Sequence, residues 1–124
     1  MYQTLLWLYI ANAVLLITHE IDSAYWKEWE LFKLPGGING FLLLHLPLLF
    51  FILYGLVLVF QHSAAGLWLS ALLSFGGIFA FAIHTFFIKK GRPEFKTPVS
   101  LSLLIAMLVV SLVQAAVTFY LLIT

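Results

Sequence analysis

The sequence contains no cysteine, and only 9% of its 124 residues are charged. Without cysteine the chain has no thiolate nucleophile, no disulfide and no Cys-ligated zinc or iron–sulfur site. A metal ion held by side chains would therefore have His, Asp and Glu as its ligands. The low charge content also excludes an ordinary soluble domain, in which about 25% of residues are charged.

Hydrophobic residues make up 64% of the chain, and the mean hydropathy is +1.11. A helix needs about 20 apolar residues to cross a bilayer. Four apolar runs have about that length or more: 4–22, 40–60, 64–88 and 99–122. The sequence therefore predicts one domain, residues 1–124, of all-α class: an integral membrane four-helix up-down bundle surrounded by membrane lipids. We expect no nucleic-acid partner, and the composition leaves a homo-oligomer open.

The basic residues predict how the chain is oriented in the membrane. The link 61–63 and both tails contain no Lys or Arg. All six lie in the first and third links: Lys27, Lys33, Lys89, Lys90, Arg92 and Lys96. Because cytoplasmic loops are enriched in Lys and Arg, both termini are expected to be extracytoplasmic.

The first link, 23–33, mixes aromatic rings with charges. Tyr25, Trp26 and Trp29 alternate with charged residues such as Lys27 and Glu28. This pattern predicts a short interfacial amphipathic segment lying in the membrane plane, and an aromatic belt at a helix end stays open as an alternative.

The stretch 18–23 places His19, Glu20 and Asp22 at the end of the first apolar run. Intramembrane ionisable groups cost about 2.5 to 3.5 kcal/mol and indicate function. In a helix His19 and Asp22 share one face, because they are three residues apart. Glu20 projects about 100° away from His19.

Two further histidines are expected at the same depth. His45 lies near the start of the second span, two residues before Pro47, and His84 lies one turn before the end of the third. With the predicted orientation, His19, His45 and His84 all lie roughly 5 to 10 Å inside the cytoplasmic interface. His62 falls at the opposite surface. The matched depth predicts one joint histidine cluster.

Three imidazoles and a carboxylate suit Zn²⁺, Fe²⁺ or Mn²⁺. The predicted metal ligands are His19, Asp22, His45 and His84, and the predicted catalytic residues are Glu20 and Asp22, with Glu20 as a spare ligand or general base. This set favours a metal-dependent membrane enzyme, a hydrolase or oxidoreductase, that acts on a lipid or other apolar small molecule. Two alternatives remain: His45 and His84 as axial ligands of haem in a redox module, or a structural protein whose histidines bridge helices.

The spacing of these residues resembles a group of small bacterial four-span membrane proteins named for a His-x-x-Glu-Glu motif. The resemblance rests on His19 to Ser23, His45, His84 and the turn 91–98. Asp22 and Ser23 stand where that motif has its two glutamates, and Ala80 stands where an asparagine is expected. The resemblance implies a polar site of enzymatic type and a location in the bacterial inner membrane.

Overall fold

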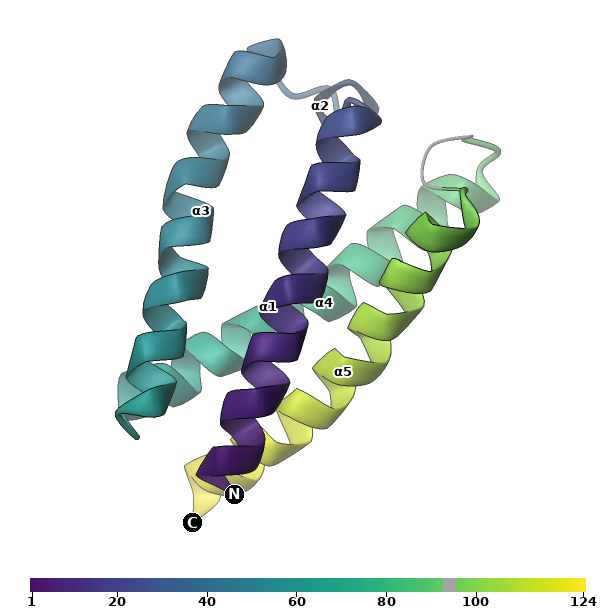
Figure 1. The fold of residues 1–124 in the computed structure, drawn as a ribbon. Helices are drawn as coiled ribbons and strands as arrows, with labels where there is room; N and C mark the ends of the chain where they lie inside the picture. Colours follow the sequence, from purple (N-terminus) through teal and green to yellow (C-terminus); the bar gives the residue numbers. More distant parts are fainter. Residues whose placement is uncertain (93–95) are drawn as a thin grey trace.

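The computed structural model describes residues 1–92 and 96–124, and these form helices and no strands. The long helices are α1 (Tyr2–Tyr25), α3 (Gly37–Phe60), α4 (Ala64–Lys89) and α5 (Pro98–Ile123), with the one-turn helix α2 (Glu28–Leu31) after α1 (Figure 1). Each of these four helices has enough residues and enough apolar side chains to cross a membrane. The all-α class and four helices of membrane-spanning length and composition are therefore confirmed. Of the expected turn 91–98, residues 93–95 lie outside the described residues.

The chain ends meet at one end of the bundle, and α2 lies at the other (Figure 1). Helices α1 and α4 each contact the other three long helices, whereas α3 and α5 make no contact with each other over the described residues. Helices α3 and α4 lie close together at the link that joins them and diverge toward the end with α2 (Figure 1). The candidate site residues occupy this diverging end.

Buried hydrogen bonds join α1, α4 and α5 halfway along the bundle. Asn12 Nδ2 donates to Gln114 Oε1 at 2.8 Å and to Ser111 Oγ at 3.0 Å, and Gln114 Nε2 donates to Ser70 Oγ at 2.9 Å. A Cβ atom added to Gly77 would lie 2.0 Å from Ser111 Oγ, so α4 and α5 pack closely at this point. Such polar contacts and small residues favour association of membrane helices.

The first link differs from a continuous amphipathic helix. Helix α1 runs three residues beyond the expected end at residue 22, and Lys27 then adopts a left-handed conformation with φ of 54°. This reversal starts α2 in a new direction. Leu31 is consequently buried and Glu28 is largely buried, while Lys27 and Glu30 remain exposed. The link thus packs against the bundle and brings a carboxylate into it.

Candidate functional site

Two of the three predicted histidines lie together. His19 on α1 and His84 on α4 are both 1% exposed, and their ring centroids are 4.6 Å apart in an edge-to-face arrangement. His62 is stacked on Tyr2 with a centroid separation of 4.2 Å, beside the N-terminus. The sequence-based separation of His62 from the other histidines agrees with this geometry.

His45 on α3 is held by two partners. Its Nδ1 atom lies 2.7 Å from the carbonyl oxygen of Phe41, and its Nε2 atom contacts Oε2 of Glu20 on α1. A carbonyl oxygen can only accept a hydrogen bond, so Nδ1 carries a proton. The contact between Nε2 and Oε2 then needs one further proton, which belongs either to an imidazolium or to a protonated carboxyl. Glu20 and His45 together therefore share one proton.

His84 faces a second carboxylate, which α2 supplies. Its Nε2 atom lies 3.5 Å from Oε1 of Glu28, whose side chain is 13% exposed. The ring of Phe32 lies 5.8 Å from the His84 ring, between centroids. Burial raises the pKa of the Glu28 carboxyl, but the hydrogen bond and charge of His84 lower it by more, so this pKa lies below the ordinary glutamate value. Glu28 is therefore suited to stay ionised.

The two carboxylates reach one cavity. A cavity of about 190 Å³ lies between α1, α2 and α3, and Glu20, Glu28 and His45 are among the residues that line it. Its rim includes Leu34 and Leu44, which are both exposed. The Glu20 and Glu28 charges also act on each other. The Glu20–His45 pair and the Glu28–His84 pair thus belong to a single polar site, the acid–base site below.

Asp22 does not line the cavity of the acid–base site. Its Oδ1 atom accepts a hydrogen bond of 2.9 Å from Trp26 Nε1, and its side chain borders a hollow toward Thr97 and Ser100 at the start of α5. In the part of the chain that the structure describes, no hydrogen bond or ion pair joins Asp22 to His45. The structure therefore does not pair Asp22 with His45, and the expected grouping of Asp22 with His19 and His84 stays a prediction.

The described residues 1–92 and 96–124 contain no group of three His, Asp or Glu side chains arranged to hold one metal ion. The Nε2 atom of a histidine ring is the one that haem ligation commonly uses. In this structure His45 Nε2 is directed at Glu20, and His84 Nε2 is directed at Glu28. Shared ligation of a metal by His19, Asp22, His45 and His84 stays a prediction, and so does haem binding.

Glu28 is the site residue that the sequence did not reveal. It is one of several charges in a stretch of mixed aromatic and charged residues, and its neighbour Glu30 is exposed. The distinction depends on the left-handed turn at Lys27, which no glycine marks. The one signal in the sequence that pointed to Glu28 was its closeness to His19 along the chain.

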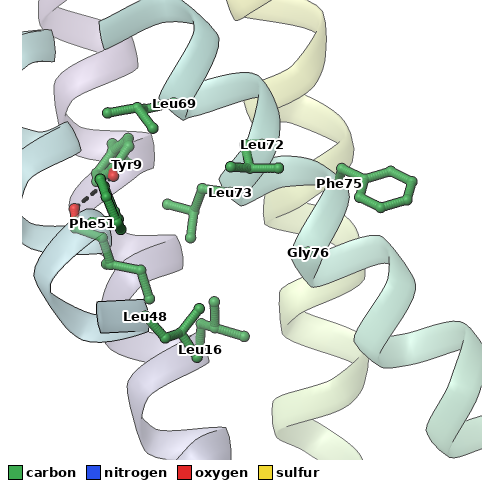
Figure 2. A pocket seen from close by; sticks show the side chains of 10 residues that line it. Tyr9, Leu16, Leu48, Phe51, Leu69, Leu72, Leu73, Phe75 and Gly76 are labelled. Atoms are coloured by element: carbon green, nitrogen blue, oxygen red, sulfur yellow. Dashed lines mark hydrogen bonds between the residues drawn. The ribbon is translucent and has the colours of Figure 1, made fainter. Parts of the chain in front are cut away.

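A larger apolar cavity adjoins this site. It has a volume of about 250 Å³ and lies between α1, α3 and α4 (Figure 2). The hydroxyl of Tyr9 donates a hydrogen bond of 2.6 Å to the carbonyl oxygen of Ile52 at its wall. Gly76 on α4 also lines it, and a Cβ atom there would meet no atom within 4 Å. Leu48 borders both cavities.

Comparison with known proteins gives a family match. Residues 5–121 match the model of a family of unknown function, DUF6713. No curated protein matches the chain, and no solved structure matches it.

Proposed function

We propose that this chain, which belongs to the family of unknown function DUF6713, is an integral membrane enzyme whose acid–base site acts on a lipid or other apolar substrate. The observation that carries the proposal is the cavity that Glu20, Glu28 and His45 line together. Perturbed ionisable groups around a cavity are the usual mark of a functional site.

Proton transfer is the chemistry that these side chains support best. The proton shared by Glu20 and His45 can be given to a substrate atom in the cavity and recovered from it, which is general acid–base catalysis. Phe41 fixes the imidazole through Nδ1, so the ring presents Nε2 toward Glu20. Glu28, held ionised beside His84, adds negative charge that stabilises a developing positive charge on the substrate.

The acid–base site belongs near the cytoplasmic face in this proposal. The basic residues of the two links occur at the α2 end of the bundle, opposite to the termini, and the positive-inside bias puts that end in the cytoplasm. Exposed Leu44 and Leu48 then offer a lateral path from the inner leaflet. The expected location is a bacterial inner membrane.

Turnover of a lipid extract tests the proposal. Wild-type protein reconstituted in vesicles made from that extract should change the abundance of one lipid class, as measured by mass spectrometry. Glu20→Gln should lower the rate by about 10² to 10⁴-fold, the usual contribution of a general acid or base. Glu30→Gln, which alters an exposed carboxylate on the same short helix as Glu28, should keep the wild-type rate. Equal rates in the wild type and Glu20→Gln would refute the proposal.

A metal-assisted form of this enzyme is the second candidate. His19, His84 and Glu28 are suitable ligand types from three elements and lie near one another, and an ion would have to draw them into a common coordination geometry that the described residues do not show. Metal analysis of protein purified without a histidine tag distinguishes the candidates. Stoichiometric metal that is lost in His84→Ala and retained in His62→Ala would favour the metal-assisted form. Undiminished turnover in metal-free protein would favour acid–base chemistry alone.

A further inference from the structure

The polar cavity and the apolar cavity lie next to each other along α3. Leu48 borders both, so a groove that joined them would run from Glu20 and His45 to Phe51 and Gly76. The volumes of about 190 Å³ and about 250 Å³ together fall within the roughly 300 to 1,000 Å³ typical of small-molecule sites. One end of the groove is acidic and the other is purely apolar.

The acidic end has the chemistry of a cation site. Besides its two carboxylates, the cavity is lined by the aromatic rings of Trp29, Phe32 and Phe41. An ammonium group is attracted both by carboxylates and by the faces of aromatic rings. Among the described residues that line it there is no Lys or Arg. His45 is the basic side chain of the lining and is already paired with Glu20, so a phosphate or sulfate group would lie beside carboxylates without a basic partner of its own.

The apolar end accepts a hydrocarbon chain. Tyr9 is the polar residue of its wall, and the Tyr9 hydroxyl is already bonded to the Ile52 carbonyl. Figure 2 shows Leu16, Leu48 and Leu73 directed into the cavity from α1, α3 and α4. Burial of each methylene group in such a space tightens binding by about fourfold.

From this charge pattern we propose that the two cavities join past Leu48 into this groove, and that the groove binds a single-chain amphiphile with an ammonium headgroup. The head lies between Glu20 and Glu28, and the chain extends past Leu48 to Gly76. This inference rests on the proposed function and specifies its substrate class. A phospholipid fits this charge pattern poorly, because its phosphate would lie beside the two carboxylates.

Native mass spectrometry of the full chain in a non-ionic detergent tests the inference with three probes: tetradecylammonium, tetradecyl sulfate and tetramethylammonium. Tetradecylammonium should bind at least about tenfold more tightly than either other probe, because only it satisfies both ends of the groove. Equal binding of tetradecylammonium and tetradecyl sulfate would overturn the choice of headgroup. Equal binding of tetradecylammonium and tetramethylammonium would overturn the role of the chain.

Two variants separate the ends of the groove. Glu28→Gln should weaken tetradecylammonium about tenfold through the lost charge. Gly76→Leu should weaken it about tenfold, because the new side chain displaces about two methylene groups of the probe, and should leave tetramethylammonium unaffected. Glu30→Gln and Ala11→Leu, at exposed positions, are the matched controls and should bind like the wild type. Unchanged binding in both test variants would refute the site.

The lipid-turnover assay and the ammonium-binding assay test separate claims, so either claim can be refuted without the other. Turnover that depends on Glu20, combined with no preference for the ammonium probe, would overturn the substrate class and keep the enzyme. Selective ammonium binding without any Glu20-dependent turnover would overturn the enzyme and keep the binding groove.

Discussion

Glu20 on α1 and His45 on α3 share one proton across the interface between their helices, since His45 Nδ1 is already committed to the Phe41 carbonyl. The pair is neutral as a whole wherever that proton resides. Neutrality matters at this position, because an unpaired charge in a low-dielectric interior costs several kcal/mol.

The shared proton predicts different results for two substitutions of Glu20. Glu20→Ala leaves the buried Nε2 of His45 without its partner and should lower the free energy of unfolding by about 1 to 3 kcal/mol. Glu20→Gln should cost less, because its amide can donate to a neutral imidazole. Thermal unfolding in detergent, followed by circular dichroism, measures both. Equal losses would show that an amide does not replace the carboxyl beside His45, and no loss in Glu20→Ala would show that the Glu20–His45 contact does not stabilise the fold.

The lowered pKa of Glu28 predicts a pH dependence of stability. A carboxyl with a lower pKa in the folded state stabilises that state above its unfolded pKa, about 4.3, and loses this contribution as pH falls through the folded value. The unfolding temperature of the wild type should therefore exceed that of Glu28→Gln at pH 6, and the difference should shrink below pH about 4.3. The groups that face Glu28 are His84, His19 and Glu20.

Glu30→Gln is the control for this titration. Glu30 lies in the same helix and is exposed, so its substitution should change the unfolding temperature little at any pH. A difference between wild type and Glu28→Gln that stays constant from pH 6 to below pH about 4 would contradict ionic stabilisation by Glu28.

Hydrophobic runs predicted the spans because length and apolar content alone determine which segments can cross a bilayer. Ser111, Gln114 and Thr118 lie on one face of α5 by helical spacing, and all three are fully buried. Such patterns are local, so they can be read from one segment. The depth argument predicted one cluster of three histidines; His19 and His84 are in contact, whereas His45 contacts Glu20.

The partners of these histidines could not be predicted in the same way. Spacing placed Asp22 near the face of His19, but its Oδ1 atom accepts a local hydrogen bond from Trp26, one turn further along at the end of the same helix. Glu20, expected on a different face from His19, reaches His45 on the neighbouring helix. Which face of α1 meets which helix depends on packing against α3 and α5. The position of the Glu28 side chain in the site depends on the left-handed turn at Lys27.

The proposed orientation of the chain, with both termini outside the cytoplasm, predicts the outcome of reporter fusions. A reporter attached after Thr124 should be active outside the cytoplasm, because the six basic residues of the two longer links favour the inside. Since both termini lie at one end of the bundle, a reporter at the N-terminus should give the same answer. A cytoplasmic signal from both would invert the proposed location of the acid–base site, and opposite signals would contradict the four-span topology.

Two adjacent glycines on α4 offer a direct test of the helix packing. Gly77→Ala places a methyl group 2.0 Å from Ser111 Oγ, which is bonded to Asn12, and should lower the free energy of unfolding by about 1 to 3 kcal/mol through overpacking. Gly76→Ala meets no atom within 4 Å and should stabilise the helix by up to about 1 kcal/mol. The two variants make the same chemical change one residue apart, so helix propensity cancels in the comparison. Unfolding temperatures that rise equally in both would show that α4 and α5 do not pack as closely at Gly77 as this arrangement requires.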